Sequence, residues 1–539
     1  MSTHEVLNQP PPLPELDLFA VDPILPAAVV REGASWATDQ LSAFGRRVGS
    51  AEVAEWGFLA NQYPPVLQTH DRFGHRVDQI EFHPAWHSLM DLSVAAGLHS
   101  LAYEAPVGGH TARAALTFLA GQIEQGHGCP ISMTSSVLAS LRHAPDIAAE
   151  WEPRILSRMY DPRYLPAAEK NGVLTGMALT EKQGGSDVRA NTSVAEPADG
   201  AYLITGHKWF VSAPVCDAFL VLAQAPGGLS CFILPRFRPD GSVNEFRIQR
   251  LKDKLGNRSN ASSEVEFEGA WAQLVGEEGR GVRTIVEMIN GTRLDCTIWS
   301  AAIMRQAVTN AAHHLTHRSA FGDLLIDKPL MRGVIADLEV ETQSATLLMM
   351  RMAGAFDRAP GDPDEAILKR IMTPIAKYWV TKRCTAVVQE ALECLGGNGY
   401  VEESIMPRLF RESPLNAIWE GSGNVIALDL LRALSREPGA RDALFSILDP
   451  TRGSDPRLDH AIDSLDRMIT GIRDPDREAR RLIERAALVI QGALAVQHGS
   501  KQLADVFCAT RLDGDWGHLF GTIPGDLAVD DLVSDARPV

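Results

Sequence analysis

Residues 177–188, MALTEKQGGSDV, form a short apolar stretch that runs into a polar loop with two adjacent glycines, Gly184 and Gly185. Glycine allows backbone N–H groups to approach a ligand closely, and the hydroxyl groups of Thr180 and Ser186 add hydrogen-bonding capacity. The pattern predicts a strand followed by a cradle for a phosphate group or for the polar edge of a ring. An ordinary surface turn is the alternative, and this segment taken alone favours the turn.

The segment opens a region, residues 176–280, in which short β-rich runs alternate with turn residues. Short strands at this spacing predict a small antiparallel β domain. Strands do not alternate with helices and no G-x-G-x-x-G pattern occurs, so a Rossmann dinucleotide fold is disfavoured. Residues 206–213 read GHKWFVSA, in which Trp209 could stack on a flat cofactor or fill the core of the sheet.

Helical patterns lie on both sides of the β region. Long amphipathic segments in succession predict a helix bundle. The predicted domains are an N-terminal leader with helices (1–175), the β domain (176–280), a four-helix bundle (281–437) and a C-terminal helical extension (438–539). The predicted fold is therefore mainly α with a central β domain.

Residues 418–424, IWEGSGN, place Glu420 in an apolar and aromatic run just before two glycines and a helical pattern. Burial in such surroundings raises the pKa of a carboxyl group, which suits a general base. The alternative is a glutamate that caps a helix or forms an ion pair.

The composition excludes several classes of protein. The formal net charge is −17 and the pI is near 5.4, which disfavours diffuse binding to nucleic acid or to an anionic membrane surface. Seven cysteines without a C-x-x-C pair argue against a disulfide framework or a zinc site, and no metal is expected. We find neither a targeting signal nor a run of apolar residues that could span a membrane, so we expect a cytoplasmic protein.

Taken together, the motifs resemble those of the acyl-CoA dehydrogenase family. The string ALTEKQGGSDV (178–188) is similar to the first family signature, and KDKLGNRSNASSEVEF (252–267) is similar to a later β-domain segment. The C-terminal signatures follow in the family's order, with RSAFG at 318–322, LGGNGY at 395–400 and WEG at 419–421. The resemblance covers residues from about 30 to 435. The motifs of this chain are most similar to those of the alkylation-response branch, which also carries an extra C-terminal helical region.

The resemblance implies a bound FAD between the β domain and the second helical region. The residues that correspond to flavin-binding positions are Met177, Leu179, Thr180, Gly185, Ser186, Trp209, Val211, Ser212, Ala213, Arg318, Phe321, Gly396, Gly397, Ile418, Gly421, Ser422 and Asn424. Among these, Arg318, Phe321, Gly396 and Gly397 resemble positions that reach the FAD of another subunit. A homotetramer is therefore implied.

The resemblance also implies the reaction. Glu420 would remove the α proton of an acyl-CoA thioester, its own backbone N–H would bind the thioester oxygen, and a hydride would pass to the flavin. Thr180, Ser186, Arg293 and Arg432 correspond to positions along the substrate channel. Arg293 could equally form a helix-surface ion pair. An electron-transfer flavoprotein is the electron acceptor expected from the family.

Two departures from the family pattern bear on function. Glu393 stands where many relatives have glutamine before the LGGNGY glycines. The exchange replaces a neutral donor with a carboxylate, so the contact with the adenosine part of FAD stays open. Arg432 corresponds to an arginine that narrows the acyl channel in the alkylation-response branch. We therefore expect slow turnover or a restriction to short or branched acyl-CoA.

Three functions compete at this point. The first is an acyl-CoA dehydrogenase. The second, which the resemblance to the alkylation-response branch implies, is a protein that binds double-stranded DNA through its C-terminal region and protects against alkylation. The third is a relative without redox activity. Arg473, Arg477, Arg481 and Arg485 are spaced by four residues and could line one helix face. From residue 435 onward, however, 13 Lys and Arg stand against 18 Asp and Glu, which favours a salt-bridged face exposed to solvent.

Overall fold

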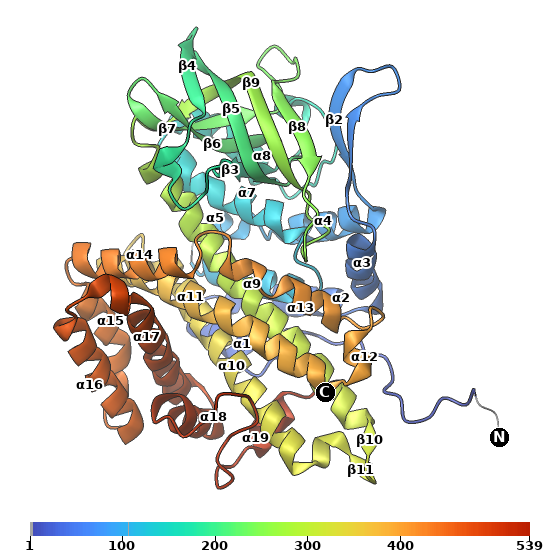
Figure 1. Ribbon diagram of the computed structural model, residues 1–539, viewed down its shortest axis with the longest axis vertical. Coiled ribbons are helices and arrows are strands. Elements are labelled where there is room, and N and C mark those ends of the chain that lie inside the picture. Colours follow the sequence, from blue (N-terminus) through green and yellow to red (C-terminus); the bar gives the residue numbers. More distant parts are fainter. Residues whose placement is uncertain (1–3, 106, 539) are drawn as a thin grey trace. The chain divides into compact units, whose positions relative to one another are not determined.

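The computed structural model describes residues 4–105 and 107–538, and it is mainly helical with one β-sheet domain, as the sequence predicts (Figure 1). Contacts divide the chain into two compact units. The first unit comprises residues 1–51, 107–123 and 296–539, and the second comprises residues 52–106 and 124–295. Both units are built from separated stretches of the chain, and one division between them falls inside the long helix α9 (Gly281–His317).

The second unit contains the sheet and the helices that precede it. Its helices are α3 (Ala51–Gln62), α4 (Pro84–Ala96), α5 (Leu101–Glu104), α7 (Gly128–Leu141) and α8 (Pro145–Ile155), and a hairpin is formed by β1 (Val66–His70) and β2 (Arg76–Glu81). The sheet strands are β3 (Thr175–Ala178), β4 (Val194–Ala198), β5 (Ala201–Ser212), β6 (Ala218–Ala225), β7 (Gly228–Pro235), β8 (Phe246–Leu251) and β9 (Ser262–Val275).

Most pairings in the sheet are antiparallel. Strands β4, β5, β9, β7 and β6 form a closed cycle of pairings, and β8 pairs with β9. Strands β6 and β7 are buried on both faces along most of their length, which explains their nearly continuous apolar sequences. Strand β3, which leads into the 177–188 loop, instead pairs in parallel with β6. Its partner is thus a strand more than 40 residues later in the chain.

The first unit is a helix bundle around α10 and α11. Its elements before the extension are α1 (Leu25–Arg31), α2 (Thr38–Val48), α6 (Gly109–Gly121), the hairpin β10 (Ser319–Ala320) with β11 (Asp323–Leu324), α10 (Pro329–Arg358), α11 (Pro363–Cys394), α12 (Gly397–Tyr400), α13 (Met406–Glu412) and α14 (Gly423–Arg436). Helix α10 is buried without interruption from Ile335 to Met350, so it forms the centre of this unit.

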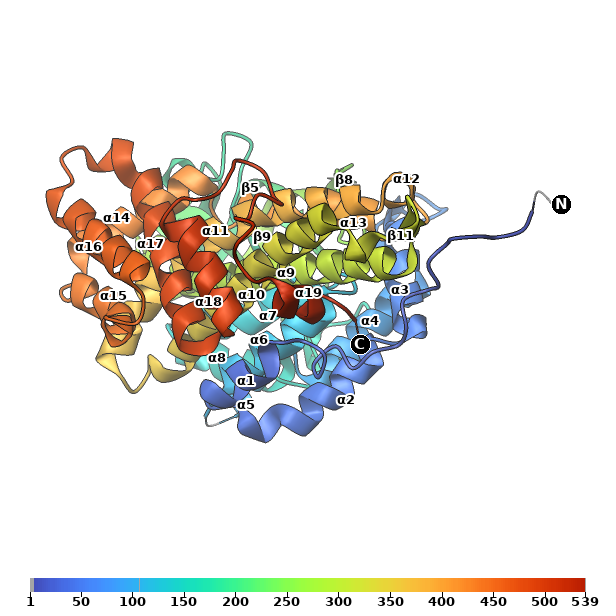
Figure 2. The same ribbon diagram turned by 90° about the horizontal axis from the view of Figure 1, so that it is seen from below.

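The C-terminal extension is helical, as predicted, and it packs onto the bundle rather than standing apart. Its helices are α15 (Ala440–Leu448), α16 (Pro456–Gly471), α17 (Pro475–His498), α18 (Lys501–Phe507) and α19 (Asp530–Asp535). Helix α17 contacts α10, α11 and α14 (Figure 2). Buried Arg511 forms ion pairs with Asp337 (2.5 Å) and Glu341 (3.0 Å) of α10, and these tie the extension to the bundle core.

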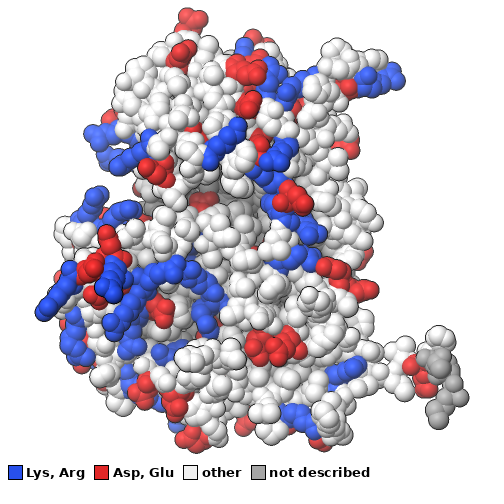
Figure 3. Space-filling view, in the orientation of Figure 1, with Lys and Arg blue, Asp and Glu red and all other residues white. Residues whose placement is uncertain are grey.

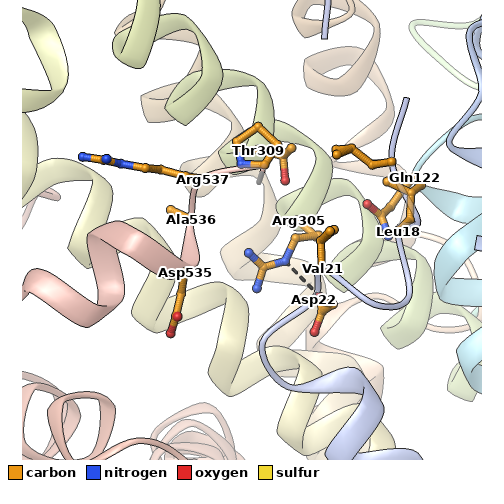
Figure 4. Close-up of a pocket in the computed structure, with 11 residues that line it drawn as sticks. Leu18, Val21, Asp22, Gln122, Arg305, Thr309, Asp535, Ala536 and Arg537 are labelled. Atoms are coloured by element: carbon orange, nitrogen blue, oxygen red, sulfur yellow. Dashed lines mark ion pairs between the residues drawn. The ribbon is translucent and has the colours of Figure 1, made fainter. Parts of the chain in front are cut away.

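Part of the leader, between residues 16 and 22, and the C-terminal tail meet at α9 in a small pocket of the first unit (Figure 4). Arg305 of α9 is buried there and forms ion pairs with Asp22 (3.1 Å) and Glu339 (2.9 Å). Asp535 and Arg537 of the C-terminal tail also line this pocket, which contains none of the residues predicted for catalysis. Because Arg305 and Asp22 pair with one another there, we interpret the pocket as a structural junction.

Two further observations concern the sequence-based predictions. All seven cysteine side chains are buried, as small apolar groups would be. Within residues 4–105 and 107–538, none of the helices combines the length and the hydrophobicity needed to cross a membrane.

Candidate active site

The 177–188 loop of the second unit is organised around Glu181, which is fully buried. Its carboxylate accepts hydrogen bonds from Lys208 Nζ (2.8 Å), from the N–H groups of Thr192 (2.7 Å) and Ser193 (3.1 Å), and from both of their hydroxyl groups. Burial raises the pKa of Glu181, but the hydrogen bonds from Gln183, Lys208 and Thr192 outweigh burial and hold the pKa well below its usual range. This glutamate therefore stays ionised and shapes the loop.

Lys208 of β5 ties the same loop to the sheet. Its side chain is fully buried and also donates to the carbonyl oxygen of Leu222 (2.8 Å) on β6. The backbone N–H of the next residue, Trp209, donates to the carbonyl oxygen of Thr180 (2.8 Å). The structure thus brings Thr180 and Trp209, two predicted site residues, into direct contact.

The glycines of the loop serve two different purposes. Gly184 has φ 137°, and a Cβ atom there would meet no atom of the described residues within 4 Å. At Gly185 a Cβ atom would lie 2.4 Å from Thr180 Oγ1, so a side chain would push the loop apart. One glycine therefore leaves open space beside the backbone, and the other permits the tight fold of the loop.

The end of β5 carries the remaining candidates of the second unit. Val211 and Ala213 are buried, and Ala213 adopts φ 48° while its N–H donates to the carbonyl oxygen of Ala261 (2.7 Å). The Trp209 ring is half-buried and carries Lys252 Nζ 3.5 Å from its centre. Trp209 is therefore not part of the core of the sheet. The ammonium group of Lys252 covers its ring instead.

The segment around Glu420 lies in the first unit, on a short turn before α14. Glu420 has φ 57°, in the left-handed region that glutamate rarely adopts, and Gly421 follows with φ 103°. Trp419 Nε1 donates to Asn416 Oδ1 (2.9 Å), and buried Asn416 Nδ2 donates to Ser300 Oγ (3.2 Å) of α9. The turn is thus anchored to a long helix of its own unit.

The predicted flavin residues after Glu420 lie at the start of α14. Ser422 occupies the N-cap position, and Asn424 Oδ1 accepts a hydrogen bond from Arg480 Nε (2.8 Å) of the extension helix α17. Lys382 of α11 lies close to the same helix end, since a Cβ atom at Gly423 would be 2.9 Å from its Nζ. Two cations and a helix N-terminus therefore create a positive environment there.

The hairpin with Arg318 and Phe321 projects from the end of α9. The Phe321 side chain is 98% exposed, and its φ of 55° marks the tip of the turn. Asn8 of the leader holds the base of the hairpin: Asn8 Nδ2 donates to the carbonyl oxygen of Ser319 (2.8 Å), Asn8 Oδ1 accepts from the N–H of Ser319 (2.7 Å), and Arg318 donates to the carbonyl oxygen of Asn8 (2.6 Å). A hairpin that is hydrogen-bonded at its base thus presents an exposed phenylalanine.

The remaining candidates are placed as follows. Gly396, with φ 58°, and Gly397 border open space, because a Cβ atom at either would meet nothing within 4 Å among the described residues. Ile418 and Arg432 are exposed in the first unit, and Arg293 is buried in the second. The structure therefore groups the predicted residues into a β-domain set and a helical set.

Sequence reasoning missed the residues that hold these segments in place. Glu181 and Lys208 were visible only as parts of motifs, and Asn8 lies in a leader that was interpreted as irregular. A lysine within the β-rich run 206–213 was the one available signal for Lys208. Asn8 carried no such signal, because its partners are more than 300 residues away.

Comparisons with known proteins agree with this geometry. The family model "Adaptive response protein AidB N-terminal domain" matches residues 8–162, "Acyl-CoA dehydrogenase, middle domain" matches residues 176–270, and "Acyl-CoA dehydrogenase, C-terminal domain" matches residues 279–435. The chain is 46% identical to the putative acyl-CoA dehydrogenase AidB of Escherichia coli (strain K12) over 95% of each chain. The chain belongs to the acyl-CoA dehydrogenase family. The resemblance seen in the sequence is confirmed.

Two further comparisons extend this finding. The chain is 31% identical to acyl-CoA dehydrogenase family member 11 of Caenorhabditis elegans, over 85% of this chain and 80% of that protein. The crystal structure of Caenorhabditis elegans ACDH-11 in complex with C11-CoA superposes with a TM-score of 0.86 at 28% identity, covering 95% of this chain and 93% of that one. Acyl-CoA dehydrogenases are flavoprotein oxidoreductases that act on the CH–CH bond of acyl-CoA thioesters.

Proposed function

We propose that this protein is an FAD-dependent acyl-CoA dehydrogenase in which Glu420 is the catalytic base. The observation that carries the proposal is the conformation of Glu420. A non-glycine residue held at φ 57° beside a second left-handed residue is strained, and such strain is characteristic of functional sites. In a chain of this family, a strained glutamate in the family's WEG position is best explained by catalysis.

The chain's own residues fit an FAD. Open space beside Gly184, Gly396 and Gly397 would admit the cofactor close to the backbone. The positive start of α14, with Lys382 and Arg480, suits the charge of a diphosphate. The residues that would hold FAD are Met177, Leu179, Thr180, Gly185, Ser186, Trp209, Val211, Ser212, Ala213, Ile418, Gly421, Ser422 and Asn424, with Arg318, Phe321, Gly396 and Gly397 serving a second copy.

The chemistry divides between the cofactor and the protein. FAD, when bound, accepts the hydride that leaves the β-carbon of the thioester. The backbone N–H of Glu420 donates a hydrogen bond to the thioester oxygen and stabilises the negative charge that develops there. The Glu420 carboxylate removes the α proton, and the electron pair of that C–H bond becomes part of the new C=C bond.

The substrate is proposed to be a short or branched acyl-CoA, with slow turnover. Arg432, which is exposed within its unit, would restrict the acyl channel. We further propose a cytoplasmic homotetramer that passes electrons to an electron-transfer flavoprotein. The functional boundaries would fall near residues 175, 280 and 437, where the sequence changes character.

The decisive experiment is the Glu420→Gln variant, which keeps the size of the side chain and removes the base. Anaerobic addition of butyryl-CoA, isovaleryl-CoA or octanoyl-CoA should bleach the flavin of the wild-type protein. The variant should bind FAD equally well and show no bleaching. Bleaching at the wild-type rate in the variant would remove Glu420 from the mechanism.

A second candidate function is binding of double-stranded DNA with a role in protection against alkylation. The observation in its favour is a basic patch made of Lys382, Arg480, Arg481 and Arg485. Burial lowers the pKa of Lys382, and the charge of Arg480 lowers it further. The pKa of Arg485 is likewise lowered by burial and by the charge of Arg481. Figure 3 shows Lys and Arg side chains gathered over α14 and α17. Such mutual repulsion would be relieved by a polyanion.

A further inference from the structure

Lys377 is a buried lysine of α11 that contacts the residues before and after Glu420. Its side chain is 1% exposed. Its Nζ donates to the carbonyl oxygen of Trp419 (2.8 Å) and to the carbonyl oxygen of Gly421 (2.5 Å). These carbonyl groups belong to the residues directly before and after Glu420, so one amine holds the backbone on both sides of the base.

The turn needs such support because its backbone conformation is energetically unfavourable. Glu420 and Gly421 follow one another with φ 57° and φ 103°, and a glutamate in the left-handed region persists only where its surroundings impose it. Both flanking carbonyl oxygens accept a hydrogen bond from the same buried amine, that of Lys377. Without that amine, two partly buried carbonyl oxygens would lose a partner, and the turn would be free to relax.

The direction of the hydrogen bond has a chemical consequence. The C=O and N–H groups of a trans peptide point in opposite directions. The carbonyl oxygen of Trp419 and the N–H of Glu420 belong to one peptide group. Because Lys377 binds that oxygen, the N–H of Glu420 points away from Lys377. A donor on the oxygen also polarises the peptide group and strengthens the N–H as a donor.

We propose that Lys377 is a positioning residue for catalysis, which aims and strengthens the Glu420 N–H as the donor to the thioester oxygen and fixes the Glu420 side chain. This inference rests on the proposed function, since it assigns to Lys377 the support of that same base. The class of ligand concerned is an acyl thioester whose carbonyl oxygen becomes negative as the α proton leaves.

The test separates proton removal from hydride transfer. In 3-thiahexanoyl-CoA a sulfur atom replaces the β-carbon, so no hydride can leave while the α protons remain exchangeable. We expect the FAD-loaded wild-type protein in D2O to introduce deuterium at the α-carbon of this probe. Lys377→Met, which keeps the length and loses the donors, should slow the exchange by roughly 10- to 100-fold. FAD content should stay unchanged.

Matched variants control for fold and for charge. Lys369→Met makes the same change on the same helix, where the lysine lies over Phe356, and should exchange at the wild-type rate. Lys377→Gln keeps one donor and should fall between wild type and Lys377→Met. It also serves as the test if Lys377→Met does not fold, because a merely structural role would then predict full exchange in any folded Lys377→Gln protein.

The outcomes distinguish this inference from the proposed function. Wild-type exchange in folded Lys377→Met or Lys377→Gln, together with no exchange in Glu420→Gln, would overturn the role of Lys377 and leave Glu420 as the base. Exchange in Glu420→Gln at the wild-type rate would overturn the proposed function itself. Slow exchange in both Lys377 variants, with normal exchange in Lys369→Met, would establish the inference.

Discussion

Lys208 and Glu181 form a charged pair from which solvent is fully excluded. Removing one partner of such a pair leaves an uncompensated buried charge, which costs about 3–5 kcal/mol. We therefore expect Lys208→Met to lower the free energy of unfolding by about that amount and to release the 177–188 loop, with loss of bound FAD. Urea unfolding monitored by fluorescence, together with the flavin absorbance of the purified protein, checks both effects.

The double variant Lys208→Met/Glu181→Gln provides the control for this prediction. It removes both charges, so its free energy of unfolding should lie closer to wild type than that of Lys208→Met alone. Equal destabilisation in the single and double variants would show that the pair is held together by packing and not by charge.

Glu124 makes stability depend on pH in the acid range. Burial raises its pKa, but hydrogen bonds from His127 and Ser259 (2.6 Å) outweigh burial and lower the pKa to about 2. A carboxyl group whose pKa is lower in the folded state stabilises the protein above its unfolded pKa, and this contribution is lost as the pH falls. We expect about 3 kcal/mol to disappear between about pH 4.5 and pH 2.

The measurement compares wild type with Glu124→Gln. Thermal unfolding at a series of pH values should give a stability difference that shrinks steadily as the pH falls through this window. A difference that stays constant with pH would show that the Glu124 carboxylate is not preferentially stabilised in the folded protein.

At the scale of single residues the sequence indicated candidate segments but not what holds them in shape. The strings around Thr180 and Glu420 are local, so the motif order and the resemblance reveal them. The roles of Lys208 and Lys377 depend on which backbone carbonyls come within about 3 Å after folding. Tertiary packing sets those distances, and local sequence does not encode them.

Among the elements, the β10–β11 hairpin makes the most specific prediction. Phe321 is 98% exposed, so Phe321→Ser should change the stability of the single chain by less than about 0.5 kcal/mol. If this hairpin reaches the FAD of another copy, the same variant should lose FAD or dissociate the oligomer. Size-exclusion chromatography with simultaneous flavin and protein absorbance measures both. A fully loaded oligomer would show that the hairpin does not serve the flavin site.

The order of elements was predictable because each element leaves a periodic signal in the sequence. Helices, β domain, bundle and extension follow one another along the chain in the predicted order. The parallel pairing of β3 with β6 was not predictable, because short strands carry no record of their partners. The docking of α17 against α10, α11 and α14 was equally hidden. An amphipathic face shows that a helix is covered, but not by which neighbour.

For the molecule as a whole, the way the extension is attached decides how DNA binding can be tested. Arg511 is buried against Asp337 and Glu341, and Arg383 of α11 also pairs with Glu341 (3.0 Å). Deleting residues 440–539 would uncover these carboxylates and the apolar faces of α10 and α11. We expect such a truncated protein to aggregate, so loss of DNA binding after truncation would carry no information about the basic patch.

Charge reversal at the surface avoids this problem. Arg481 belongs to the basic patch, and exposed Arg477, one turn before it on α17, extends that patch. If the patch binds duplex DNA, Arg477→Glu/Arg481→Glu should weaken binding and flatten the slope of log K against log salt by about 2. The matched control is Arg441→Glu/Arg452→Glu, in the same extension, where each arginine is already paired with an aspartate. Equal affinity and equal salt slope in both double variants would exclude the patch as a DNA-binding surface and leave the dehydrogenase as the sole supported function.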